Sequence, residues 1–221
     1  MWGITFSYVE GRRATDFIGV VLAVSFIFAG GFSRSVGKWV MLHWEVNSFW
    51  MPFVTASIFA IPLLLFYYLL EGVPPPDEAD EAERTIRMPM DAVQRQQFLT
   101  KFAPGVVAFV FIYLLLTVLR DLRDNYMANM WNELGYAGSA GIFARTESIT
   151  SLVVLVLIGT LVLVRNNRKA FRWIHLLLLL GFAVAFTSTL LFRMQLLGGA
   201  AWMQLTGLGL YMGYILFNSV Y

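Results

Sequence analysis

Long uninterrupted runs of apolar side chains constrain this 221-residue chain more than any other feature of its sequence. A helix needs about 20 mostly apolar residues to cross the hydrocarbon core of a bilayer. Six segments meet this requirement, at residues 16–41, 48–70, 102–120, 141–164, 171–192 and 200–220. A water-soluble fold cannot bury runs of this length, whereas a bilayer can. The sequence therefore predicts an all-α membrane protein with about six full transmembrane helices and a partial one at the N-terminus.

Composition excludes several classes of function. Charged residues make up 14% of the chain, against about 25% in a soluble domain. The net charge is only +2, and no basic stripe with interleaved aromatic residues is present, so nucleic acid is not an expected partner. The chain has no cysteine, and it shows no metal-ligand spacing, phosphate loop or nucleophile motif. We expect a lipid bilayer as the surrounding medium, and no cofactor, metal or enzymatic activity.

One long polar stretch, residues 71–101, divides the apolar segments. It opens with prolines at 74–76, which favour an extended linker, and an acidic run at 77–83 follows. Asp91 and Gln94 have the spacing of a capping box, which predicts a short amphipathic helix at the membrane surface. We expect the end of an N-terminal helix bundle, a linker and the first four helices of a C-terminal bundle, at residues 1–70, 71–101 and 102–221.

Lysine and arginine in the short loops predict the orientation. They concentrate around residues 12–13, 84–101 and 165–172, whereas the intervening loops at 42–47, 125–140 and 193–199 carry only Arg193. Six spans place the three basic regions on one face of the membrane. We therefore expect both termini and the linker in the cytoplasm.

The most unusual segment follows the third apolar run, where four charges occur within six residues. On a helix, part of this cluster falls on one stripe with two preceding polar residues. The stripe consists of Tyr113, Thr117, Arg120 and Asp124. Arg123 lies beside it. A guanidinium offers planar, bidentate recognition of an anion. The carboxylates could hold the arginines in place or take part in proton coupling.

An equally weighted alternative is an ion-pair network at the outer membrane interface. Arg120 lies roughly 27 Å along a helix from Phe102, which is nearly a full hydrocarbon thickness. For the other charges near the outer span ends, the favoured interpretation is snorkelling to the headgroups; these are Arg34, Lys38, Arg145 and Glu147. Glu147 nevertheless shares a helix face with Thr150 and Ser151, and it stays a candidate site residue.

The last apolar segment carries a polar stripe at seven-residue spacing, formed by Gln204, Tyr211 and Asn218. Such a stripe could line an aqueous path, or it could form helix–helix hydrogen bonds, which is the more common use. Gly209 and Gly213 form a small-xxx-small pair that permits close helix contact. Tyr211 and Asn218 complete the candidate substrate-binding set.

The order of these features resembles the middle of a major facilitator superfamily transporter, from the end of its fourth helix through its tenth. A Glu-Gly-Arg-Arg loop at 10–13 precedes the first span, and a proline-containing span leads into the charged linker. Residues 113–120 are similar to the seventh helix of the organophosphate:phosphate antiporter branch. That resemblance implies Arg120 as a substrate-binding arginine.

A more specific resemblance covers essentially the whole chain. The strings at 10–13, 35–39, 49–54, 131–136 and 166–171 look like those of DUF5690, a bacterial family of transporter-like membrane proteins. This resemblance implies the bacterial inner membrane and no particular substrate.

A full facilitator has twelve helices in two halves. The chain would hold two full helices of the first half and four of the second, so we expect an internal fragment whose missing helices are its partners. The leading hypothesis is a fragment of a secondary active transporter that works by alternating access on a small solute, with an anion as the candidate class. The alternatives are a membrane enzyme acting on a phosphorylated lipid and a non-transporting scaffold or sensor.

Overall fold

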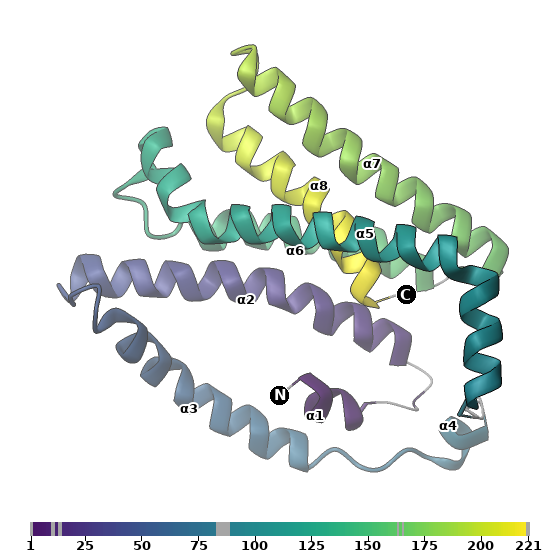
Figure 1. Ribbon diagram of the computed structural model, residues 1–221. Coiled ribbons are helices and arrows are strands. Elements are labelled where there is room, and N and C mark those ends of the chain that lie inside the picture. The colour runs from purple at the N-terminus through teal and green to yellow at the C-terminus, as the bar shows by residue number, and fades with distance from the viewer. Residues whose placement is uncertain are drawn as a thin grey trace.

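A computed structural model describes residues 2–9, 12, 15–82, 89–162, 164 and 166–219. Within these residues every regular element is a helix and no strand occurs (Figure 1). The long helices are α2 (Thr15–His43), α3 (Met51–Glu71), α5 (Ala92–Trp131), α6 (Ile142–Val162), α7 (Asn167–Arg193) and α8 (Gly199–Ser219). The short elements are α1 (Trp2–Ser7), α4 (Glu78–Ala82) and the π-helix η1 (Asn132–Tyr136). The prediction of an all-α protein is confirmed.

Five helices in the described part of the chain are long and apolar enough to cross a membrane. These segments are Phe17–His43, Met51–Glu71, Ala92–Tyr136, Ile142–Leu161 and Arg168–Arg193. Helix α8 occupies the sixth predicted segment, but its polar residues and glycines lower its hydropathy and it is not among the five. The chain is thus a membrane-embedded helical protein, while the count of six spans stays a prediction.

Helix α8 lies at the centre of the bundle, where it contacts α2, α5, α6 and α7. Leu210, Met212, Ile215 and Leu216 on this helix are buried in the main apolar core. Because α8 is enclosed by protein, its polar side chains meet other helices instead of hydrocarbon. A central position therefore lets this helix carry polar side chains without exposing them to hydrocarbon.

Helices α2 and α6 pack along each other, as do α7 and α8 (Figure 1). Gly209 on α8 faces Gly181 and Ala185 on α7, so close that an added Cβ at Gly209 would lie 2.8 Å from the Ala185 nitrogen. The small residue at 209 thus permits the expected close contact. Helix α3 packs mainly against α2 among the described helices, and most of its apolar side chains are exposed, as lipid contact would require.

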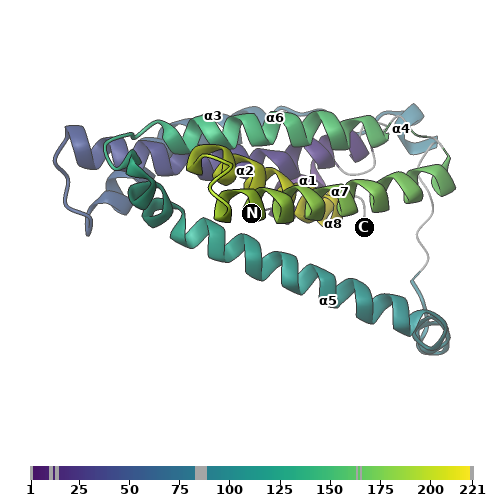
Figure 2. The ribbon, with the colours of Figure 1, turned by 90° about the horizontal axis from the view of Figure 1, so that it is seen from above.

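The turns between α2 and α3, between η1 and α6, and between α7 and α8 gather at one end of the molecule (Figures 1 and 2). The C-terminal end of α6 and the N-terminal ends of α2 and α7 lie at the opposite end. Successive long helices therefore alternate in direction, as spanning helices with short loops must. Which end faces the cytoplasm stays a prediction.

The linker leads into α5, which begins with the expected capping box. The Gln94 backbone N–H donates to Asp91 Oδ1 at 2.7 Å, and the Asp91 N–H donates to Gln94 Oε1 at 3.1 Å. The expected amphipathic helix is the first part of α5 and not a separate element. Figure 1 shows that this part runs almost perpendicular to the rest of α5, and Pro104, which lacks a backbone N–H, lies in the helix.

Candidate functional site

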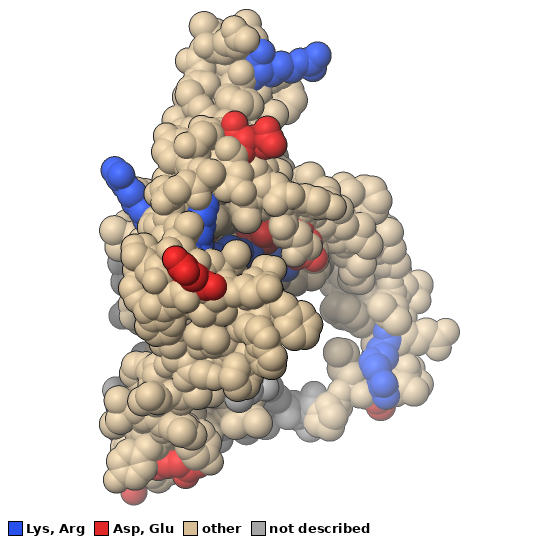
Figure 3. Space-filling model, turned by 90° about the vertical axis from the view of Figure 1, so that its left-hand side faces the viewer, with Lys and Arg blue, Asp and Glu red and all other residues tan. Residues whose placement is uncertain are grey.

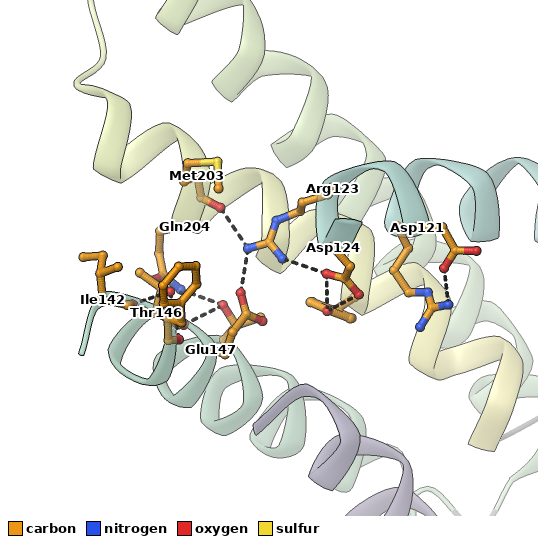
Figure 4. A network of polar contacts seen from close by, with 12 residues as sticks. Asp121, Arg123, Asp124, Ile142, Thr146, Glu147, Met203 and Gln204 are labelled. Carbon is orange, nitrogen blue, oxygen red and sulfur yellow. Dashed lines mark hydrogen bonds and ion pairs between the residues drawn. The ribbon is translucent and has the colours of Figure 1, made fainter. Parts of the chain in front are cut away.

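Arg123 on α5 turns into the bundle and holds three helices together (Figure 4). Its Nη2 donates to Glu147 Oε1 on α6 at 2.8 Å and to the Met203 carbonyl on α8 at 3.3 Å. The side chains of Arg123 and Glu147 are only 5% and 1% exposed. A buried pair of this kind stabilises the fold only while both charges are present, because either one alone would be buried without a partner.

Two glycines provide the space that this pair needs. A Cβ at Gly207 on α8 would collide with Arg123 Nη2. A Cβ at Gly31 on α2 would lie 2.6 Å from Glu147 Cγ. Glycine at these two positions therefore lets α8 approach the arginine and lets α2 approach the glutamate.

Asp124, the residue after Arg123, extends the network toward α8. The Tyr211 hydroxyl donates its one proton to this carboxylate, shared between Oδ1 at 3.0 Å and Oδ2 at 3.1 Å, and Asp124 Oδ1 lies 3.5 Å from Arg123 Nη1. The Arg123 guanidinium also lies over the Tyr211 ring, 5.6 Å from its centroid. The negative charge of Asp124 is therefore largely satisfied by protein partners.

On the other side of Glu147, Gln204 of α8 binds α6. Its amide Nε2 donates to the Thr146 carbonyl at 3.1 Å and to Thr150 Oγ1 at 2.7 Å. The polar stripe on α8 thus forms helix–helix hydrogen bonds at this position, which is one of the two uses predicted for it.

A cavity of about 440 Å³ lies beside this network, between α2, α5 and α8. It is lined by Ala23, Phe26, Ile27, Gly30, Arg34, Arg120, Asp124, Tyr211, Tyr214, Ile215 and Asn218. The end-on view in Figure 3 shows a mostly uncharged surface in which basic and acidic atoms meet in a recess near the middle. The cavity therefore brings a few charged groups into an otherwise apolar protein.

Two arginines in this cavity have spare hydrogen-bonding capacity. Arg120 forms an ion pair with Asp121 and lies over the Tyr214 ring, 4.4 Å from its centroid, and its Nε is buried without a hydrogen-bond partner among the described residues. Arg34 makes no ion pair in the part of the chain that the structure describes, and its Nη1 lies near Gly30. Both guanidinium groups can therefore accept an anionic partner.

Tyr113, a predicted site residue, does not line the cavity but contacts two residues that do, Asn218 and Tyr214. The Tyr113 hydroxyl donates to Asn218 Oδ1 at 3.2 Å, and Asn218 Nδ2 donates to the Tyr214 carbonyl at 2.8 Å. The rings of Tyr113 and Tyr214 stack with centroids 5.8 Å apart. Together with Arg120 they make a continuous stack of one guanidinium and two aromatic rings.

The structure brings together most of the predicted site residues, which then separate into two groups. Arg120, Asp124, Tyr211 and Asn218 line the cavity, whereas Arg123 and Glu147 form the buried pair beside it. Thr117 does not line the cavity, because its hydroxyl donates to the backbone carbonyl of Tyr113 at 2.8 Å.

The prediction of snorkelling is wrong for Glu147, because this residue is 0% exposed. Its position near the start of α6 suggested a membrane surface, but α2, α5 and α8 enclose it there. Lys38 also has partners inside the protein, since its Nζ lies 3.3 Å from Asn132 Oδ1 and 3.4 Å from the Tyr136 carbonyl in η1.

Arg34 is the cavity residue that the sequence did not single out as a site. The signal was present, because Ala23, Ile27, Gly30 and Arg34 share one face of α2 by helical spacing. The charge could be assigned either to a headgroup or to a cavity, and only the neighbouring helices decide between them. In the described part of the chain, no group of three or more His, Asp or Glu side chains is placed to hold a metal ion.

The fold and this site define a helical membrane protein with a charged cavity enclosed between its helices. The chain belongs to the DUF5690 family, a family of unknown function, whose model matches residues 1–221. This match confirms the family predicted from the sequence. Neither the curated proteins nor the solved structures contain a match to the chain.

Proposed function

We propose that this protein is a membrane-embedded part of a secondary active transporter that binds a small anionic solute in the cavity between α2, α5 and α8. One observation carries the proposal: the cavity is lined from both sides of the linker at 71–101, by α2 before it and by α5 and α8 after it. Two-bundle transporters bind their solute between the bundles and rock one bundle against the other around that site.

The charges of the cavity favour an anion. Asp124 is engaged by Tyr211 and Arg123, while Arg34 and the partly exposed Arg120 line the cavity with their guanidinium groups. Guanidinium groups remain charged at any physiological pH and match the geometry of carboxylate and phosphate oxygens. A cation would meet two arginines here, so the proposed solute class is anionic.

The arrangement of the helices is compatible with alternating access. Helix α2 meets the later group of helices along α6 and α8, and small residues such as Gly31 lie at this boundary. Rocking at this boundary would change the distance between Arg34 on α2 and Arg120 on α5. A bound anion would thus be held by both groups in one state and released as they separate.

The test is uptake in proteoliposomes by the full transporter that contains this chain. Radiolabelled inorganic phosphate, succinate and terephthalate are supplied separately, with protein-free vesicles as the background. We expect uptake of at least one anion above background, and a loss of tenfold or more with Arg120→Gln. No uptake of any of the three would overturn transport, and full uptake by Arg120→Gln would overturn the role of Arg120.

A further inference from the structure

The cavity has two chemically different walls. Helix α2 contributes Ala23, Phe26 and Ile27 before Gly30 and Arg34, so its wall is apolar over most of its length and charged at one end. Helices α5 and α8 oppose it with Arg120, Asp124, Tyr211 and Asn218. A ligand that fills this space must therefore be amphipathic.

The size of the cavity leads to the same conclusion. About 440 Å³ is within the range of pockets that bind small organic molecules. An inorganic anion would occupy a small part of it and leave Phe26, which is 61% exposed, uncovered. Covering this apolar wall with an apolar part of the ligand is favourable, because it removes hydrocarbon surface from water.

Arg120 contributes a partly exposed guanidinium to this cavity. Tyr214 covers the group at 4.4 Å from its ring centroid, and the Arg120 side chain is still 27% exposed. A guanidinium matches the geometry of carboxylate oxygens, so a carboxylate is the expected charged end of an amphipathic ligand.

We infer that the cavity takes an organic carboxylate with an apolar body, held by Arg34 and Arg120 at its charged end and by Phe26 along its body. This inference deepens the proposed function, because it assigns a ligand class to the same cavity. It does not require transport, since binding alone reports the class.

Calorimetric titration of the full chain in lipid nanodiscs, with empty nanodiscs subtracted, tests the inference. The probes are benzoate, acetate and benzamide, which separate the ring from the charge. We expect benzoate to bind at least tenfold more tightly than acetate and than benzamide. Equal affinities for benzoate and acetate would overturn the inference.

Two variants test the apolar wall and the charged wall of the cavity separately. Phe26 is 61% exposed, so Phe26→Ala leaves the fold intact, and it is expected to weaken benzoate binding severalfold without changing acetate binding. Arg120→Gln is expected to weaken the binding of both carboxylates, while the unfolding temperature of the variant stays near that of the native chain. A Phe26→Ala variant with unchanged benzoate affinity would overturn the role of the apolar wall.

The result is distinguishable from a failure of transport. Uptake of phosphate or succinate that depends on Arg120, together with equal binding of benzoate and acetate, would keep the proposed function and overturn the ligand class. Selective benzoate binding without uptake of any anion would keep the ligand class and overturn transport. No binding of either carboxylate would overturn the ligand class.

Discussion

Arg123 and Arg120 lie one helical turn apart on α5, yet their surroundings differ completely. Arg123 is 5% exposed and is bound by Glu147 on another helix, by the Met203 carbonyl and by Asp124. Arg120 pairs with Asp121, a carboxylate whose side chain is 51% exposed, and it lies at the wall of a cavity. The same side chain therefore serves as an internal link in one position and as an open donor in the other.

The comparison shows that the two arginines differ in their protein partners and their exposure, and not in the charge that they carry. The Arg123 guanidinium is 5% exposed and holds a carboxylate at 2.8 Å, so a ligand cannot reach it, and removing it leaves the partner unpaired. A guanidinium with an exposed partner contributes little to stability, because water screens the pair. Four substitutions break or sharpen this contrast, and their expected effects on stability fall in order.

Arg123→Met is expected to have the largest effect, because it leaves Glu147 buried without its partner. The expected loss is about 3–5 kcal/mol of unfolding free energy. A denaturant titration of the chain in mixed micelles, followed by tryptophan fluorescence, measures it. The double variant Arg123→Met with Glu147→Gln is expected to recover much of this loss, and equal losses for the single and double variants would contradict the pairing.

Tyr211→Phe removes the hydroxyl that donates to Asp124 without changing the shape of the ring. A hydrogen bond to a charged group contributes about 1.5–3 kcal/mol, so a loss in this range is expected in the same titration. Tyr126→Phe serves as the control, because the Tyr126 side chain is 54% exposed. A loss no greater than that of the control would show that Asp124 does not depend on Tyr211.

Gly207→Ala places a methyl group where the Arg123 guanidinium lies, so either the helix or the arginine must move. We expect a loss of about 1–3 kcal/mol, the usual cost of overpacking. Gly159→Ala is the matched control, because its new Cβ would make an ordinary contact with Phe17 at 3.9 Å. Combining Gly207→Ala with Arg123→Met should give less than the sum of the two losses, since both act on the same group.

Arg120→Gln is expected to have the smallest effect on stability, below about 1 kcal/mol, because its ion-pair partner is half exposed. Its effect should appear in anion binding. A large loss of stability for this variant would place Arg120 with Arg123 as a structural residue and would end the contrast between them.

Much of the fold could be predicted from local patterns. The apolar runs identified the helices, and the capping box at Asp91 and Gln94 identified the start of α5. The continuity of that helix through Pro104 could not be predicted, because proline usually ends a helix and only the surrounding structure shows that it bends instead. The central position of α8 likewise could not be predicted, because no pattern within the helix specifies it.

The candidate site was predicted less completely. The stripe on α5 contained Arg120 and Asp124 and the stripe on α8 contained Tyr211 and Asn218, and all four line the cavity, while their role in binding stays a prediction. Arg34 and the two glycines at 31 and 207 were missed as site residues, because their roles depend on helices distant in the sequence. Glu147 was expected near the headgroups, since its distance from the end of its own helix says nothing about the helices that cover it.

The sequence by itself determined the class of this protein, its family and the positions of its charged stripes, because run length and helical period act within one segment. Only the tertiary structure decided which charges are compensated and which face a cavity. A guanidinium on a helix can reach a lipid headgroup, a buried carboxylate or a ligand with equal ease. The packing of α2, α5 and α6 around α8 selects among these partners, and that packing is a property of the whole bundle.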